Sequence, residues 1–182
     1  MTLTFYRLGK IQMMDAALYI LAQFAGAIGG IMIATRLLGD KVAHPNVQYA
    51  ATYPGHTGSL LAAAGEFVIS FLLMLTVLYV SNHTTLSPFT GLFAGFLVAT
   101  YIAFEAPFSG MSMDPARTFA SALPSGTWKG FWIYIVVQPL GMLAAAELFL
   151  KSTIRDSVRC CKMYHNPQRY CIFCGANGDF HA

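Results

Sequence analysis

Charged side chains are scarce in this sequence. Asp, Glu, Lys and Arg make up only 10% of its 182 residues, whereas 56% are hydrophobic. In a soluble domain about a quarter of the residues are normally charged. The shortage excludes an ordinary soluble domain and gives no reason to expect a nucleic-acid partner. It predicts a protein embedded in a lipid bilayer.

Motifs of catalysis and of secretion are lacking as well. No pair of nucleophile and base, no phosphate-binding loop and no nucleotide motif is evident, so we expect neither an enzyme nor a cofactor in the apolar part of the chain. Arg7 and Lys10 precede the first apolar stretch, but no small-residue cleavage site follows it. That stretch is therefore expected to insert as a span.

Four stretches are long and apolar enough to cross a bilayer, which takes roughly 17 to 25 helical residues. They cover residues 16–33, 59–80, 89–104 and 131–150. Both ends of the chain carry Lys and Arg: Arg7, Lys10, Lys151, Arg155, Arg159, Lys162 and Arg169. Because basic flanks stay in the cytoplasm, both termini are expected there, and an even number of spans agrees. The predicted fold class is an all-α, multi-pass membrane protein.

A short helix-start signal lies between the last two spans, in residues 110–122. Asp114 suits an N-cap and Pro115 the first helical position, and Arg117 follows within the first turn. The segment is too short to cross a bilayer. It predicts a re-entrant half-helix that enters from the outside and points its positive dipole end at a pore.

A short sequence in the first span is repeated, with changes, in the last span. Gln23-Phe24-Ala25-Gly26 resembles Gln138-Pro139-Leu140-Gly141. An odd number of crossings separates the two copies, which predicts an inverted repeat around a solute path at the bilayer midplane. A repeat of this length can also arise by chance.

With these features the chain resembles the major intrinsic protein family, the aquaporins and glycerol facilitators. The motifs that carry the resemblance are residues 110–117 followed by Thr118-Phe119, Gly65-Glu66-Phe67 with Phe71, residues 23–30, and Trp132-Ile133-Tyr134 leading to Pro139. The resemblance covers about residues 2–150. It implies an inverted-repeat helical bundle in which two half-helices meet at paired Asn-Pro-Ala motifs, assembled as a homotetramer.

The chain departs from the family pattern twice. The resemblance places Met1-Thr2 where the family has the two residues after its first Asn-Pro-Ala, so we expect this sequence to lack the first two spans and that motif, and to be a fragment rather than a naturally short member. The second motif reads Asp114-Pro115-Ala116. We expect residues 1–11 to be a remnant of the first half-helix, residues 12–151 the transmembrane domain, partial relative to the family, and residues 152–182 a basic, Cys-rich cytoplasmic tail.

The resemblance also implies the roles of single residues. The pore and its selectivity filter would involve Asp114, Pro115, Ala116, Arg117, Ile102 and Met111. Arg117 would form the filter, although an ion pair with Asp114 one turn away is the alternative. Glu66 would accept backbone N–H groups of residues 108–113 and support the filter, with proton carriage as the alternative.

Two further groups of residues carry predictions. Gly26 with Gly30, and Gly91 with Gly95, have the small-xxx-small spacing that lets membrane helices approach closely. In the tail, Cys171 and Cys174 have the C-x2-C spacing of zinc sites, and with Cys161 and His165 they would form a ligand set. Reduced cysteines without a metal are the alternative.

The expected function is a passive channel for water and small neutral solutes such as glycerol, in the plasma membrane. Thr118 and Ala122 stand where glycerol facilitators commonly have an acidic and a basic residue, which favours water, but solute choice stays open. The alternative is a non-conducting, truncated membrane subunit that packs with full-length relatives or recruits a partner through its tail.

Overall fold

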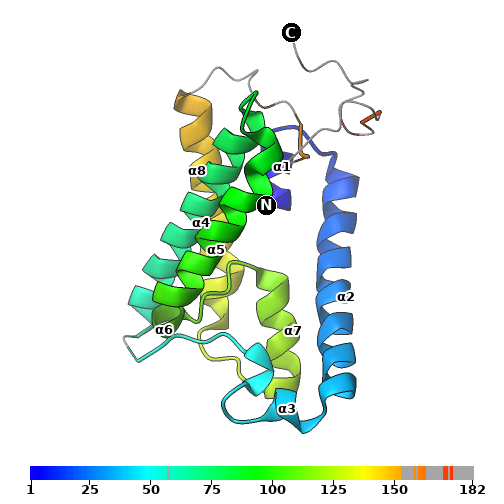
Figure 1. Ribbon diagram of the computed structural model, residues 1–182, viewed down its shortest axis with the longest axis vertical. Coiled ribbons are helices and arrows are strands. Elements are labelled where there is room, and N and C mark those ends of the chain that lie inside the picture. The colour runs from blue at the N-terminus through cyan, green and yellow to red at the C-terminus, as the bar shows by residue number, and fades with distance from the viewer. Residues whose placement is uncertain (57, 153–157, 159, 163–169, 172, 174–182) are drawn as a thin grey trace.

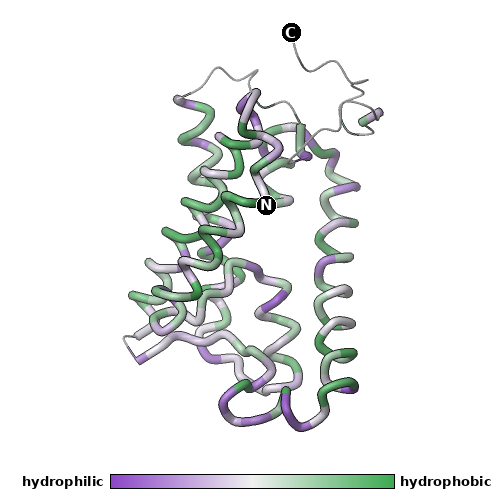
Figure 2. The backbone as a smooth tube through the Cα atoms, in the orientation of Figure 1, coloured by the Kyte–Doolittle hydropathy of each residue, from purple (hydrophilic) through white to green (hydrophobic). Residues whose placement is uncertain are grey.

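The computed structural model describes residues 1–56, 58–152, 158, 160–162, 170, 171 and 173. Its long helices run roughly along the long axis of the molecule, and two shorter helices start near the middle (Figure 1). Hydrophobic residues dominate the long helices, while hydrophilic ones gather in the connecting loops (Figure 2). This distribution is what a bilayer requires of spanning helices.

The four predicted spans are confirmed. In the described part of the chain, four segments are long and apolar enough to cross a membrane: Met13–Leu38, Ser59–Ser81, Ser87–Phe104 and Ile133–Ser152. They contain the helices α2 (Met13–Leu38), α4 (Ser59–Asn82), α5 (Thr90–Phe104) and α8 (Gln138–Ser152), with a 3-10 turn η2 (Ser87–Phe89) before α5 and a π-helical stretch η3 (Ile133–Val137) before α8. The shorter elements are α1 (Thr2–Arg7), α3 (Asp40–Ala43), η1 (Gln48–Ala50), α6 (Ala106–Ser109) and α7 (Pro115–Ser125).

The π-helical stretch before α8 was not predicted from the apolar pattern. Pro139 has no N–H, so it cannot bond the carbonyl four residues back, and a wider turn accommodates the missing hydrogen bond. The stretch buries Tyr134 completely. Its hydroxyl donates to the carbonyl of Ser109, which ties the start of the last span to the end of α6.

The main core lies where α4 and α8 pack against each other and against α1. Phe5, Met74, Val77 and Phe149 are among its buried members. Gly141 permits the closest approach, because a Cβ at this position would lie 2.6 Å from the carbonyl oxygen of Phe67. The bundle thus depends on a glycine that the spacing argument did not single out.

The four glycines that were singled out do not bring helices of this chain together. A Cβ added at Gly26, Gly30, Gly91 or Gly95 would meet nothing within 4 Å. Within the described part of this chain no helix packs closely on these glycines, and close packing against another chain stays a prediction. The physical reason is their position: they lie on exposed faces of α2 and α5.

Helix α2 stands apart from the bundle (Figure 1). Only 6% of its most apolar 18-residue window is buried, compared with 44% for the last span. Its main neighbour is α7, which it meets through a ring contact between Phe24 and Phe119 with centroids 5.5 Å apart. Much of the apolar surface of α2 is consequently left for lipid or for another protein.

Candidate functional site

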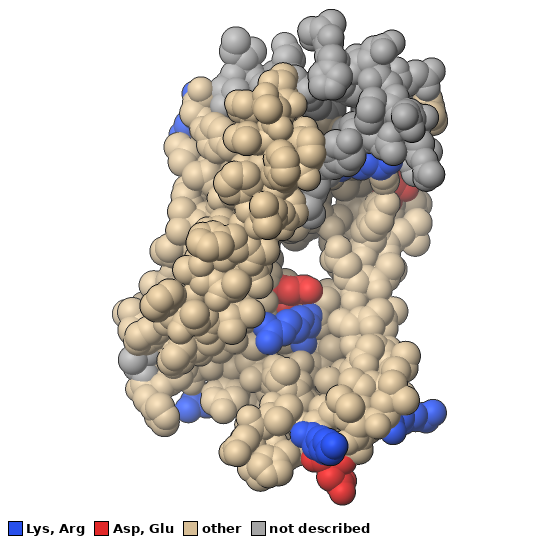
Figure 3. Space-filling view, in the orientation of Figure 1, with Lys and Arg blue, Asp and Glu red and all other residues tan. Residues whose placement is uncertain are grey.

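The N-termini of α1 and α7 face each other near the middle of the molecule, and the two helices run from there toward opposite ends (Figure 1). A cavity of about 400 Å³ lies between these N-termini. Residues 1–4 line it from one side and residues 113–116 from the other, while Gln23 and Gln138 contribute polar side chains. A space-filling view shows a hollow at mid-height (Figure 3).

Helix α7 begins as its sequence predicts. Asp114 is the N-cap with extended backbone, and its carboxylate accepts the N–H of Ala116 at 2.9 Å. Pro115 occupies the first helical position, where its missing N–H is harmless. The carboxylate of Asp114 is thereby held at the edge of the cavity, where the family pattern has an amide.

Arg117 is held by backbone carbonyls of the preceding loop. Its Nη1 donates to the carbonyl of Met111 at 2.7 Å and lies 3.5 Å from that of Ser112. Met111 adopts a left-handed backbone with φ 46°. The alternative of an ion pair with Asp114 is wrong, because among the described residues the ion pair found joins Arg7 to Glu147.

Glu66 lies in α4 and is completely buried. Both of its carboxylate oxygens accept hydrogen bonds. Its Oε1 accepts the N–H of Ser112 at 2.7 Å and the hydroxyl of Ser109 at 2.8 Å. Its Oε2 accepts the N–H of Met113 at 3.1 Å and the amide of Gln138 at 2.9 Å. A buried carboxylate needs several hydrogen-bond donors, and here two of them are backbone N–H groups of the loop before α7. Glu66 is therefore placed to support that loop.

A hydroxyl network joins the same loop to a distant segment. Thr118 in α7 shares hydrogen bonds with Ser112 and, at 2.8 Å, with Thr52. The N–H of Gly55 donates to the carbonyl of Phe108 at 2.9 Å. Sequence reasoning missed Thr52, because no local pattern links residues that are 66 positions apart.

Ile102 and Met111 differ in their surroundings. Met111 is 4% exposed and presents its carbonyl to Arg117. Ile102 on α5 is 57% exposed and does not line the central cavity. A filter formed by Ile102 opposite Arg117 stays a prediction.

Glu105, directly after α5, is a site residue that sequence reasoning missed. Its Oε1 packs over Gly65, where an added Cβ would lie only 2.6 Å away. Burial, with a further contribution from the nearby carboxylate of Glu66, raises the pKa of Glu105 from 4.5 to about 7. A second carboxyl group, that of Glu105, therefore lies near Glu66, and a Glu that follows an apolar span was the available signal.

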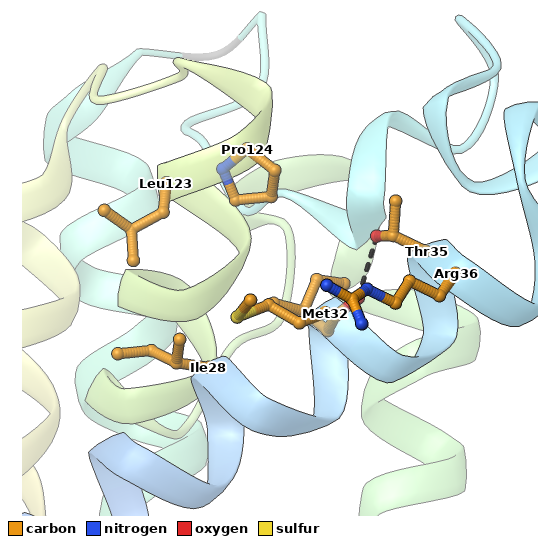
Figure 4. Close-up of a pocket in the computed structure, with 7 residues that line it drawn as sticks. Ile28, Met32, Thr35, Arg36, Leu123 and Pro124 are labelled. Carbon is orange, nitrogen blue, oxygen red and sulfur yellow. Dashed lines mark hydrogen bonds between the residues drawn. The ribbon is translucent and has the colours of Figure 1, made fainter.

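A second cavity, of about 330 Å³, lies between α2 and α7. Figure 4 shows Ile28 and Met32 of α2 opposite Leu123 and Pro124 of α7. The hydroxyl of Thr35 on its rim donates to the carbonyl of Ile31 at 2.8 Å and is thus satisfied within the helix. Thr35 and Arg36 are the polar residues that line this otherwise apolar cavity, which therefore offers a hydrophilic solute fewer polar groups than the central cavity does.

The predicted metal ligands fall in the C-terminal segment. His165 and Cys174 lie outside the described residues. Cys161 is partly exposed and Cys171 is buried. The sulfur atom close to that of Cys171 is that of Cys160, a residue not included in the predicted set. Among the described residues, no three potential ligands come together.

Comparison with known proteins agrees with the geometry. The family model described as major intrinsic protein matches residues 1–149. Aquaporin NIP3-1 of Zea mays is 31% identical over 158 residues, which are 86% of this chain and 51% of that protein. Probable aquaporin NIP4-2 of Arabidopsis thaliana is 33% identical over 152 residues, 81% of this chain and 51% of its own length.

Nodulin-26 of Glycine max is 27% identical over 149 residues, which cover 81% of this chain and 53% of that protein. The chain thus spans about half the length of the curated relatives it matches. The family model, by contrast, accounts for most of this chain. With its spanning helices and its half-helix capped by Asp114-Pro115-Ala116, the chain belongs to the major intrinsic protein family.

Proposed function

We propose that this chain is a passive channel for water and small neutral solutes rather than an enzyme. The observation that carries the proposal is the central cavity at which the N-termini of α1 and α7 meet. A path between two helix ends is lined by backbone donors that no intrahelical carbonyl uses. Such donors can bind water and the hydroxyl groups of small solutes. Binding of this kind involves no chemical reaction.

The charges around the path account for solute choice. Each helix N-terminus carries about half a positive charge, which disfavours cations. Arg117 does not itself line the central cavity, but its guanidinium, bound by the carbonyl of Met111, adds a full positive charge in the first turn of α7. The carboxylate of Asp114 opposes both effects, so the barrier to cations and protons is expected to be weaker than with an amide there.

Water is the solute that the surroundings of α7 favour, with glycerol as the second candidate. Thr118 and Ala122 are buried and neutral, so neither contributes a charge to the path. Two of the relatives named above, those of Zea mays and Arabidopsis thaliana, are aquaporins by name. Placement in the plasma membrane with both termini in the cytoplasm, and assembly as a homotetramer, belong to the same proposal.

A second candidate function rests on α2. Only 6% of its most apolar 18-residue window is buried, so a large apolar face of α2 is open to a partner. In this function the chain does not conduct. Its exposed α2 face packs against a full-length relative, or its tail recruits a partner. Conduction by the chain alone distinguishes the two functions.

Proteoliposome swelling tests the proposal. Vesicles containing the purified chain are expected to equilibrate in a water gradient faster than protein-free vesicles, and an Arg117→Ala variant to alter the ratio of glycerol to water permeability. Lys129→Ala, at an exposed residue outside the path, is the matched control. Rates equal to those of protein-free vesicles would contradict conduction and favour the subunit.

A further inference from the structure

The short motif that the first and last spans share brings two glutamines to the central cavity. Gln23 lies on α2 and Gln138 begins α8, and both side chains line the cavity. The two helices stand on different sides of the molecule (Figure 1). The repeat therefore places one side-chain amide on each of two cavity walls.

The amide of Gln138 is held in one orientation. Its Nε2 donates to Oε2 of Glu66 at 2.9 Å. A carboxylate accepts hydrogen bonds and has none to donate, so the amide cannot turn its oxygen toward Glu66. Gln138 is completely buried, and among the described residues no group donates to its Oε1. This oxygen is a buried acceptor that the described part of the protein leaves unused.

A solute in the central cavity can supply the missing donor. A buried polar atom without a hydrogen bond is destabilising, and such atoms are normally paired with protein or with water. The cavity that Gln138 lines has a volume of about 400 Å³, far more than one water molecule needs. Thr4 and Asp114 line the same cavity and provide further polar atoms. The cavity is thus roomy and polar enough to hold a hydrogen-bonding occupant.

Gln23 repeats the arrangement on the other wall. Its Nε2 donates to the hydroxyl of Thr2 at 3.2 Å. In this amide too a protein group takes the donor end, and the oxygen is the end left for a solute. Gln23 is exposed, so its oxygen can be reached without a change in packing. Neither oxygen carries a formal charge, which suits a neutral donor.

We propose that the amide oxygens of Gln138 and Gln23 form an accepting subsite of the central cavity, which binds neutral solutes through their O–H donors, namely water and small hydroxyl compounds. The inference rests on the proposed channel function and adds two residues that determine which solutes pass. Water that enters a narrow path gives up hydrogen bonds to bulk water, and acceptors on the wall replace them. The subsite therefore lowers the barrier for a solute with donors and does nothing for a solute that has none.

An experimental structure of the full-length chain, at a resolution that shows ordered water, tests the subsite without any transport. We expect a water molecule within about 3.2 Å of Oε1 of Gln138, the range of a hydrogen bond. The subsite is overturned if this oxygen accepts a hydrogen bond from a protein group instead. It is also overturned if neither water nor another solute lies within that distance.

Water permeability of proteoliposomes tests the part that the subsite plays in passage. Gln138→Met and Gln23→Met nearly keep the size of the side chain and remove the amide oxygen, and each should lower water permeability by about three- to tenfold. The two amides have different anchors, Glu66 and Thr2, so a loss common to both variants points to the oxygens rather than to either anchor. Gln12→Met is the matched control, because Gln12 is exposed and does not line the cavity.

The outcomes separate this inference from the channel function. If the parent chain conducts and both glutamine variants conduct as fast, the subsite is overturned and the proposed function stands. If the parent chain does not conduct, the proposed function is contradicted, and the water position at Gln138 decides on the subsite. If Gln138→Met fails to fold, the exposed Gln23 provides the transport test, and an unchanged rate in Gln23→Met then overturns the subsite.

Discussion

Glu66 accepts the backbone N–H of Ser112 at 2.7 Å across 46 positions of sequence. The same carboxylate accepts hydrogen bonds from Met113, Ser109 and Gln138, so one side chain of α4 fixes the loop before α7, and that loop in turn binds Arg117 through the carbonyl of Met111. The position of the filter candidate is therefore set from inside the bundle.

Replacing this carboxylate should loosen the loop. In Glu66→Ala the buried donors lose their acceptor, and each unsatisfied donor costs about 1–3 kcal/mol. We expect a lower apparent Tm in detergent and lower water permeability, with Glu66→Gln intermediate. Glu147→Gln is the control, since an exposed ion pair such as Glu147 with Arg7 contributes about 0–1 kcal/mol. Equal losses in both variants would show that Glu66 does not support the loop.

Arg117→Lys tests the hydrogen bond to Met111. Lysine keeps the charge but lacks the planar donor fork, so it should hold the carbonyl less firmly. We expect glycerol uptake relative to water to rise up to about tenfold, which corresponds to ~1.4 kcal/mol of barrier. Stopped-flow light scattering measures both rates. An unchanged ratio would mean that the guanidinium geometry plays no part in solute choice.

Asp114→Asn separates the charge of this residue from its capping role. Asparagine caps as well as aspartate, so α7 should be preserved, while the carboxylate at the cavity is removed. Proton and cation leak, followed with a pH-sensitive dye inside vesicles, should decrease. Asp114→Ala should instead lower stability by about 1 kcal/mol through loss of the cap. If the parent chain and Asp114→Asn leak at the same rate, the charge of Asp114 does not weaken the barrier.

Glu105 should make stability depend on pH. The unfolded chain loses this proton near pH 4.5 and the folded chain near 7, so the folded state binds the proton more tightly. The contribution of Glu105 to the free energy of unfolding is complete below pH 4.5 and is lost as pH rises through 7. In Glu105→Gln this decline should flatten, and the variant should be more stable than the parent chain at pH 8. Parallel Tm curves for the two proteins from pH 5 to 8 would contradict the raised pKa.

A pair of glycine variants tests where the helices pack. Gly141→Ala places a methyl group 2.6 Å from the carbonyl of Phe67, and such overpacking costs typically about 1–3 kcal/mol. Gly26→Ala meets open space and should leave stability unchanged or raise it by up to about 1 kcal/mol through helix propensity. Thermal unfolding in detergent compares them. If the two variants lower Tm equally, the packing of α4 on α8 is not as close as described.

Local pattern was sufficient for much of this fold. The apolar stretches predicted all four spans, because a bilayer admits a helix only where a long run of apolar residues occurs. Asp114 and Pro115 predicted the start of α7, since capping depends on neighbouring residues only. The expected support from Glu66 came from the family resemblance, and its four donors came from the structure.

The failures share one cause, which is that contact partners lie far apart in sequence. Small-xxx-small spacing identified Gly26 and Gly91, but whether a glycine faces a helix depends on how the bundle is arranged, and Gly141 and Gly65 face the close contacts instead. The link from Thr52 to Thr118 had no local signal for the same reason.

Hydrophobic length and capping are properties of short stretches of chain, so the residues alone identify an all-α membrane protein with a capped half-helix. Two contacts became visible only in three dimensions: Arg117 binds the carbonyl of Met111 rather than Asp114, and Cys160 is the neighbour of Cys171. Both outcomes depend on the paths of loops in space, where a left-handed backbone or a buried anchor outweighs sequence spacing.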